Sequence, residues 1–277
     1  MHFLIDADSL IYKAGCSNET RSYLVCSGEN IITTFKYKKE AVEFVDGDET
    51  LSIEFHKEAG PLANSLSNLD KKMVSILENP RCTSHKAYIG GGKNFRYDID
   101  PNYKGQRDPS TRPLHEKQIR KHLVEHWDAE VISDIEVDDH VSVLALQDPN
   151  VNVIVTIDKD LDNTPGWHYN YDKEIGRYIT PGEADLNFYR QLLSGDPTDN
   201  IKGIKGIGTL TAKDMLPHEL TPERLCSIAW RAYEEKGYSW EYMVQQGQLL
   251  WMLREFGVMW SPPIDKPVTP EEDIQCA

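Results

Sequence analysis

The chain has 277 residues, a net charge of −15, 27% charged residues and 39% hydrophobic residues, which excludes a fibrous or largely disordered protein. No apolar run approaches the roughly 20 residues that a bilayer requires, so no membrane association is expected. The five cysteines are scattered and never spaced as CxxC, and the N-terminus has no leader pattern. We therefore expect a cytoplasmic protein without a disulfide framework or a zinc knuckle.

Charge is sorted along the chain. Residues 86–126 carry nine Lys or Arg against five Asp or Glu, whereas residues 128–200 carry four against sixteen. A carboxylate-rich block beside a basic block is typical of a metal-dependent enzyme that acts on an anion. The alternative is a solvated surface without chemistry.

The N-terminal part begins with a short apolar strand at residues 3–6, which ends in Asp6. Clusters of β-branched and aromatic residues broken by glycines predict the short strands of an excursion between residues 21 and 56. The sequence indicates no chemistry for this excursion. Apolar residues at spacings of three and four then predict an amphipathic crossover helix at residues 61–78.

Strands and helices alternate in the middle of the chain. The predicted strands lie at residues 86–89, 130–132 and 151–158, and the predicted helices at residues 114–127, 138–147 and 182–194. This alternation predicts an α/β fold with a parallel sheet flanked by helices, in which the carboxyl ends of the strands share the edge where ligands bind. The C-terminal part is predicted to hold helices at residues 222–236 and 240–256 and a poorly ordered tail after Ser261.

Acidic residues stand at the ends of these elements: Asp6, Asp8, Glu136, Asp138, Asp139, Asp158, Asp160, Asp196 and Asp199. Converging carboxylates repel one another unless cations neutralise them, and oxygen-only ligands select Mg²⁺ or Mn²⁺ over zinc. Two such ions about 3.5–4 Å apart activate a water and stabilise the leaving oxygen of a phosphodiester. Taken singly, Asp138 and Asp139 could instead complement a helix N-terminus, and Asp196 could be a turn residue.

A glycine-rich segment at residues 203–212 precedes a predicted helix start at Thr209 or Thr211. Glycine lets a phosphate approach the main chain, and a helix N-terminus favours an anion. Three lysines add positive charge here. The segment predicts a grip on a phosphate backbone that reads no bases; the alternative is a purely structural turn. Its candidate contacts are Lys202, Gly203, Lys205, Gly206, Gly208, Thr209 and Lys213.

The stretch at residues 93–112 interleaves cations with aromatic rings. The cations are Lys93, Arg96, Lys104, Arg107 and Arg112, and the rings are Phe95, Tyr97 and Tyr103. This pattern suits single-stranded nucleic acid, because cations neutralise phosphates and rings stack on bases. The alternative is a solvated loop.

Five blocks together resemble the 5′-nuclease superfamily of flap endonucleases and phage 5′-to-3′ exonucleases, which has a PIN-like domain. They lie at residues 4–8, 95–107, 136–139, 156–160 and 194–208. The Gln246-Gly247-Gln248 segment is similar to the smaller phage exonucleases in particular. The resemblance implies a two-metal phosphodiesterase that removes nucleotides from 5′ ends or cuts branched junctions, as a phage-type enzyme of DNA replication or degradation in the host cytoplasm.

Carried over position by position, the resemblance implies eight metal ligands, direct or through water: Asp6, Glu136, Asp138, Asp139, Asp158, Asp160, Asp196 and Asp199. Lys104 and Arg107 match the family's basic gateway, which contacts the scissile phosphate and the single strand. We expect catalysis to depend on Asp6, Asp138 and Asp158 together with these two cations. The glycine segment matches the family's duplex-binding hairpin, which in relatives often holds a K⁺.

The resemblance also implies a domain organisation. A PIN-like nuclease domain is expected at residues 1–194, with a basic gateway at about 93–127. A helical DNA-binding region is expected at residues 195–277, with a helix-three-turn-helix at 195–216. The expected partners are DNA with 5′ ends or flaps, with RNA–DNA hybrids as a further substrate class, and the expected state is a monomer.

One position departs from the family. Relatives have an aspartate after the second strand, where this chain has Gly90-Gly91-Gly92. We hypothesise that Asp8 or a water substitutes. The departure leaves a non-catalytic protein that binds branched DNA as one alternative. A haloacid-dehalogenase-type phosphatase is another, because Asp6-Ala7-Asp8 mimics its nucleophile motif, and a PIN-class ribonuclease is a third.

Overall fold

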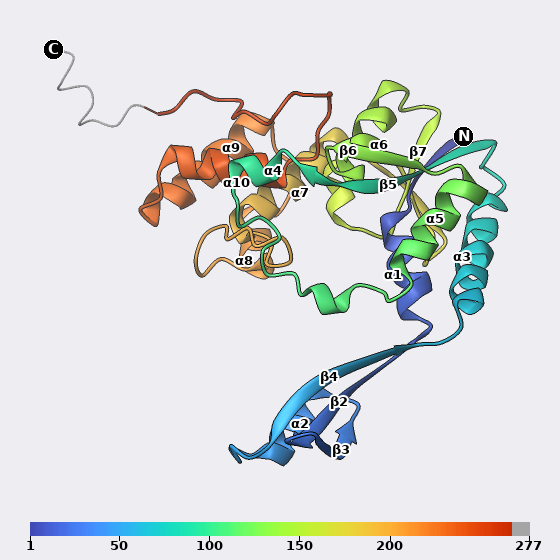
Figure 1. The fold of residues 1–277 in the computed structure, drawn as a ribbon. Coiled ribbons are helices and arrows are strands. Elements are labelled where there is room, and N and C mark those ends of the chain that lie inside the picture. Colours follow the sequence, from blue (N-terminus) through green and yellow to red (C-terminus); the bar gives the residue numbers. More distant parts are fainter. Residues whose placement is uncertain (268–277) are drawn as a thin grey trace. The chain divides into compact units, whose positions relative to one another are not determined.

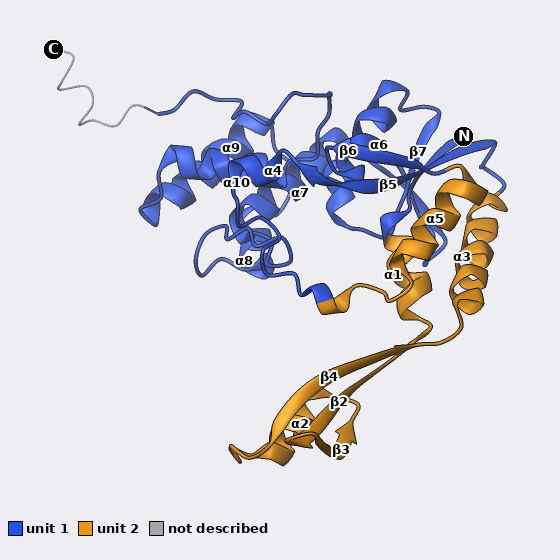
Figure 2. Cartoon of the chain, viewed as in Figure 1, with its two compact units in different colours: residues 1–8, 80–109, 129–277 blue, residues 9–79, 110–128 orange. Residues whose placement is uncertain are grey.

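The computed structural model describes residues 1–267. These residues form two compact units that interleave along the chain (Figure 2). The first unit contains residues 1–8, 80–109 and the chain from residue 129 onward, and the second contains residues 9–79 and 110–128. The expected domain boundary at residue 194 stays a prediction. The compact units divide the chain at other residues.

A six-stranded sheet forms the centre of the first unit, in the order β6-β5-β1-β7-β8-β9. Figure 1 labels three of its strands, β5, β6 and β7. All neighbouring strands are parallel except β8 and β9, which form an antiparallel pair. The central strand β1 has Leu4 and Ile5 almost fully buried, as expected for a parallel strand covered on both faces. The strands are β1 (His2–Asp6), β5 (Ser84–Asn94), β6 (Glu130–Asp134), β7 (Asn152–Val155), β8 (Gly166–Asn170) and β9 (Ile175–Ile179).

Helices flank this sheet and continue into a helical C-terminal part. The helices of the first unit are α4 (Arg96–Ile99), α6 (Val137–Gln147), α7 (Pro181–Ser194), α8 (Thr209–Met215), α9 (Pro222–Glu235) and α10 (Trp240–Leu250), with a 3₁₀ turn at Asp160–Asn163. The start of α7 is fixed by the Thr180 side chain, which accepts a hydrogen bond from the Glu183 amide, and by Pro181 in the first turn. Phe188 and Leu192 of α7 share one core with Tyr233 of α9, and Met252, just beyond α10, packs with Leu4 and Ile154 of the sheet, so the sheet and the C-terminal helices belong to one unit.

The second unit combines three helices with a small antiparallel sheet of order β3-β2-β4. Helix α2 packs on this sheet, and α3 packs against α5. Near the C-terminal end of β4, Lys57 donates hydrogen bonds to the carbonyls of Ser110, at 2.9 Å, and Arg112. The elements are α1 (Asp8–Cys16), β2 (Glu19–Ser27), β3 (Asn30–Phe35), α2 (Lys38–Val45), β4 (Ser52–Ala59), α3 (Leu62–Leu77), a 3₁₀ turn at Pro109–Thr111 and α5 (Glu116–Trp127).

Four expectations need correction. Strand β5 does not end at Ile89 but continues through the three glycines to Asn94, with a register irregularity between Gly90 and Asn94. The β8–β9 hairpin was not expected at all, and the excursion contains a helix besides its strands. The last helix ends at Leu250 instead of residue 256. Of the tail expected after Ser261, residues 268–277 lie outside the described part.

Candidate active site

Carboxylates from separate elements line one cleft of about 700 Å³ in the first unit. Asp138 comes from the first turn of α6, Asp158 follows β7, and Asp160 opens the next 3₁₀ turn. Asp196 and Asp199 come from the turn after α7. Parallel strands bring these segments to one edge of the sheet, so the expected convergence of acids is present.

Asp6 ends β1 and is 4% exposed. Its Oδ2 accepts a hydrogen bond from the Thr156 hydroxyl at 3.0 Å, and its Oδ1 accepts one from the Asp8 amide at 3.1 Å. Burial raises the pKa of Asp6 to about 7, and the nearby carboxylates of Asp8 and Asp158 add to this rise. Asp6 is therefore a buried acid surrounded by like charges.

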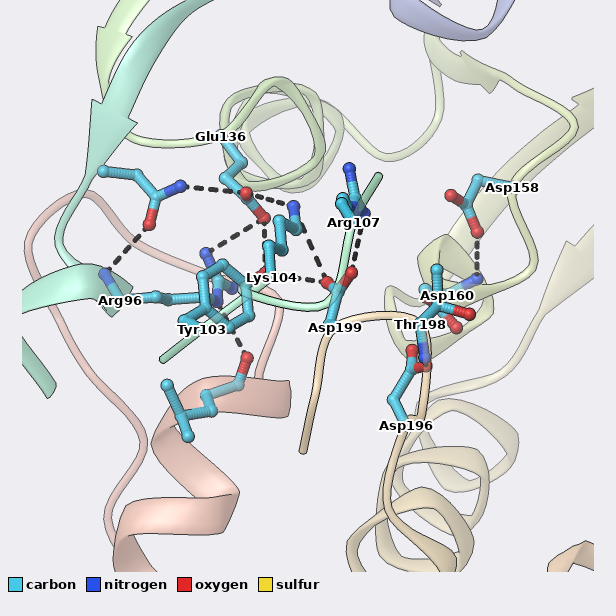
Figure 3. A network of polar contacts seen from close by, with 12 residues as sticks. Arg96, Tyr103, Lys104, Arg107, Glu136, Asp158, Asp160, Asp196, Thr198 and Asp199 are labelled. Atoms are coloured by element: carbon cyan, nitrogen blue, oxygen red, sulfur yellow. Dashed lines mark hydrogen bonds and ion pairs between the residues drawn. The ribbon is translucent and has the colours of Figure 1, made fainter. Parts of the chain in front are cut away.

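The same physics acts on two further carboxylates. Burial raises the pKa of Asp138 well above its ordinary value, and repulsion from Asp6 and Asp158 reinforces the effect. Burial also raises the pKa of Asp160 to about 7, with repulsion from Asp158 next in importance. Asp158 is held above Asp160, whose amide donates to Asp158 Oδ1 at 2.9 Å (Figure 3). So many negative charges are energetically unfavourable in a site that is this buried.

Two cations border the acids in the same cleft. Lys104 forms an ion pair with Glu136 and lies 3.6 Å from Asp199 Oδ2, and Arg107 donates to Asp199 Oδ1 at 2.6 Å (Figure 3). Burial alone would lower the pKa of Lys104, but Glu136 and Asp199 outweigh it, so the pKa rises and the amine stays charged. The cleft thus combines a cationic side with an anionic side.

Tyr103 connects these groups and was not expected in the site except as a stacking ring. Its hydroxyl lies 3.0 Å from Glu136 Oε2 and 2.8 Å from Asp199 Oδ2, and its single proton serves one carboxylate at a time. Burial raises the pKa of Tyr103 above its ordinary value, and the Glu136 carboxylate adds to this rise. The phenol therefore remains protonated and acts as a donor. The only signal for Tyr103 in the sequence was its position among the cations of the basic stretch.

Asp139 and Arg96 lie outside the cleft. Arg96 is 1% exposed and pairs with Asp139 through Nη1–Oδ2 at 2.5 Å and Nη2–Oδ1 at 2.9 Å. Arg96 also donates to the carbonyls of Leu249 and Trp251, and Asp139 Oδ1 accepts the Leu253 amide. As placed, Arg96 cannot reach a nucleic acid and Asp139 cannot reach an ion in the cleft. This corrects the expected roles of both residues: they fasten the C-terminal segment to α6.

The turn after α7 depends on two glycines with positive φ. Gly195 (φ 72°) and Gly203 (φ 57°) lie back to back, and a Cβ on Gly203 would stand 2.3 Å from the Gly195 nitrogen. Buried Gln246 accepts hydrogen bonds from the amides of Lys202 and Gly203. Gln246 of the Gln246-Gly247-Gln248 segment therefore holds the hairpin in place.

The turn is also tied to the basic stretch. The Lys104 amide donates to the Asp199 carbonyl at 3.0 Å, Asn200 Nδ2 donates to the Asn102 carbonyl at 2.8 Å, and Gln106 Nε2 donates to Asn200 Oδ1 at 2.7 Å. The two segments form one polar unit at the mouth of the cleft.

The remaining expected contacts fall in three places. Thr209 and Lys213 of α8 line the cleft. Gly206 has φ 90° and Gly208 precedes the first residue of α8. Lys93, Lys202 and Lys205 are exposed.

The acids suit a divalent cation by their chemistry. They are oxygen donors, Asp6 is almost fully buried, and the raised pKa values of Asp6, Asp138 and Asp160 record repulsion that a cation would relieve. Within residues 1–267, no three side chains of His, Cys, Asp or Glu are drawn together tightly enough to hold an ion as they stand. Binding would require the carboxylates to close in on it.

Comparisons with known proteins agree with this geometry. No family model matches the sequence. The chain is 27% identical over 175 residues to flap endonuclease Xni of Pseudoalteromonas translucida. The matched segment spans 57% of this chain and 67% of that protein. It is 26% identical over 175 residues to flap endonuclease Xni of a Shewanella species, spanning 56% and 67% respectively.

Solved structures of bacteriophage T5 proteins share the fold. A complex of the T5 D15 flap endonuclease with DNA and metal ions matches with a TM-score of 0.58 and 12% identity over 90% of this chain and 88% of that chain. T5 D15 protein crystallised with metal ions matches with a TM-score of 0.54 and 13% identity over the same shares.

The mostly parallel sheet, its acidic edge and these relatives define a nuclease. More particularly, the chain is similar in sequence to flap endonucleases and in fold to T5 5′-exonuclease, proteins of the 5′-nuclease superfamily. In the described part of the chain, no helix is long and apolar enough to cross a membrane.

Proposed function

We propose that this protein hydrolyses phosphodiester bonds in DNA at 5′ ends or flaps, using two divalent ions, Mg²⁺ or Mn²⁺. One observation carries the proposal: mutually repelling carboxylates share a cleft with the cations Lys104 and Arg107. A phosphodiester needs both, because its own charge requires positive partners and its attack requires an activated water.

The residues that would hold the ions are the acids that face one another: Asp6, Asp138, Asp158 and Asp160, with Asp196 at the rim. Ions bound there would supply charge neutralisation and an activated water. Glu136 and Asp199, which now pair with Lys104 and Arg107, would orient those two cations toward the scissile phosphate. The Tyr103 hydroxyl keeps Glu136 and Asp199 close together by donating its proton to one of them.

The glycine hairpin supports a grip on the duplex beside this cleft. Its conformation is fixed by the Gly195–Gly203 contact and by Gln246, which leaves Lys202 and Lys205 on the surface. We propose that these lysines and the amides near Gly206 and Gly208 bind the phosphate backbone, with a K⁺ at the hairpin as an auxiliary ion. Grip on the backbone selects for structure and not for sequence.

The proposed setting is DNA replication or degradation by a monomeric, cytoplasmic enzyme of the phage type. Residues 93–127 would form the gateway for a single strand and residues 195–277 the duplex-binding region. RNA–DNA hybrids are a second proposed substrate class, because contacts to the phosphate backbone do not depend on the sugar.

A flapped duplex labelled on the 5′ end in one sample and on the 3′ end in another tests the proposal. With Mg²⁺ or Mn²⁺ we expect release of the 5′ label as mononucleotides or as an intact flap, and no release in EDTA. Asp158→Asn should abolish cleavage. The matched control is Asp148→Asn, because Asp148 is an exposed acid just beyond the C-terminal end of α6, far from the first turn that carries Asp138.

A non-catalytic DNA-binding protein is the second candidate. It is favoured by the glycines of β5, which contribute no carboxylate, and by the burial of Asp139 in its pair with Arg96. Tight binding of the flapped duplex without cleavage in any metal would establish this function and overturn hydrolysis. Nothing in the fold or the relatives supports the phosphatase.

A further inference from the structure

Asp8 occupies an unusual place at the acidic edge. It opens α1 directly after β1, and both of its carboxylate oxygens accept the Gly90 amide, each at 3.1 Å. Gly90 lies in β5, the strand that pairs with β1 so that Asp6 stands opposite Tyr88. The Asp8 carboxylate therefore lies over the backbone of the neighbouring strand, at the edge where Asp6 ends β1.

Gly90 has room for a side chain except where Asp8 stands. A Cβ built on Gly90 would lie 2.8 Å from Asp8 Oδ2, and its next neighbour outside Asp8 would be Val137 Cγ2 at an ordinary 3.8 Å. The φ of Gly90 is not in the left-handed region, so an L-residue could adopt this backbone. The carboxylate of Asp8 thus fills the space that a side chain at position 90 would take.

Asp8 lies next to Asp6 of the proposed metal site. The Asp8 amide donates to Asp6 Oδ1 at 3.1 Å, while the Asp8 carboxylate accepts the Gly90 amide, so both carboxylates lie at the same edge of the sheet.

We propose that Asp8 is a ligand of the divalent ion that Asp6 binds, and that it supplies from the start of α1 the carboxylate that β5 lacks. The inference rests on the proposed metal dependence of the cleft. It predicts that the carboxylate can be carried by α1 or by β5, as long as it reaches the same place. An aspartate at residue 90 should therefore replace Asp8 once Asp8 is removed.

Four variants test this: Asp8→Asn, Asp8→Ala, the double variant Asp8→Ala/Gly90→Asp, and Asp148→Asn as the matched control. Free Mn²⁺ is titrated by electron paramagnetic resonance at pH 7.5, without DNA, and thermal unfolding confirms that each variant folds. We expect Asp8→Asn and Asp8→Ala to weaken Mn²⁺ binding at one site by at least about tenfold, the double variant to recover most of this loss, and the control to match the wild type. Cleavage of the flapped duplex against Mg²⁺ concentration should show the same order.

The outcomes separate the inference from the proposed function. Wild-type Mn²⁺ affinity in Asp8→Asn would refute the role of Asp8, even if the protein cleaves DNA. Failure of the double variant to recover affinity, when it folds normally, would instead assign Asp8 a structural role through the Gly90 amide. A wild-type protein that binds Mn²⁺ with Asp8 dependence but never cleaves DNA would overturn hydrolysis and retain the ligand. A wild-type protein that binds no Mn²⁺ would overturn both.

Discussion

Replacing Asp6 by Asn should stabilise the metal-free protein at neutral pH while abolishing cleavage. Asp6 is 4% exposed, and its pKa is raised from an ordinary value of 3.8 to about 7. A folded-state pKa above the unfolded value means that folding favours the neutral acid. The charged form is therefore penalised, so the stability of the folded state falls as pH rises from about 4 to about 7.

The magnitude follows from the shift. A difference of about 3 pKa units at about 1.4 kcal/mol per unit gives a ceiling of about 4 kcal/mol. Two effects lower this ceiling. Asp8 and Asp158 share the repulsion with Asp6, so the whole shift does not belong to Asp6 alone. In addition, Asn at position 6 loses one charge-assisted hydrogen bond, which is worth about 1.5–3 kcal/mol. We therefore expect Asp6→Asn to gain about 1–2 kcal/mol at pH 7.5 over wild type, and to gain nothing at pH 4.

Urea unfolding in EDTA, followed by tryptophan fluorescence between pH 4 and pH 8, measures this difference. The comparison of variant with wild type at each pH isolates Asp6 from the other groups that titrate in this range. Asp148→Asn is the control and should follow the wild type. Mg²⁺ should reverse the ranking, because it stabilises only a site that retains its carboxylates. A variant that parallels the wild type across the whole pH range would refute the repulsion argument.

Three further substitutions probe the rest of the site. Asp139→Ala should lower the free energy of unfolding by about 3–5 kcal/mol in urea titrations, because it leaves the buried Arg96 guanidinium without its partner; an Arg96→Met/Asp139→Leu pair should cost less, and equal losses would contradict this. Gly203→Ala should weaken binding of a duplex in fluorescence anisotropy, because its Cβ would collide with the Gly195 backbone; unchanged affinity and unchanged melting temperature would show that the turn is not needed. Lys104→Met should lower kcat by about 100-fold with little change in KM, as for loss of one preorganised transition-state donor; a change in KM alone would assign Lys104 to binding.

The acidic edge could be predicted because it follows from local order. Alternating strands and helices imply parallel strands, and parallel strands bring their carboxyl ends to one edge. Asp6 ends one short apolar strand and Asp158 follows another, so their convergence needs no knowledge of packing. The basic stretch and the glycine hairpin were likewise visible as local patterns of charge and small residues.

Long-range pairing was beyond reach of the sequence. Arg96 belongs to the cationic stretch by pattern, yet it is buried because Asp139 and the carbonyls of Leu249 and Trp251 lie around it. These partners are 43 to 155 residues away. No periodicity records such a contact. Strand β5 was cut short at Ile89 for the opposite reason: three glycines indicate a turn, but here β6 pairs with Ile89 and Gly90 and keeps the segment extended.

The structure divides the acids into two groups by the charges that lie beside them. Asp139, Glu136 and Asp199 have protein cations beside them, namely Arg96, Lys104 and Arg107. Asp6, Asp138 and Asp160 have other carboxylates as their strongest charged neighbours, and their raised pKa values record it. A divalent ion gains most where repulsion is largest. On the proposed metal dependence, the first ion should therefore bind beside Asp6 and Asp138, before any exchange with the Lys104 and Arg107 ion pairs.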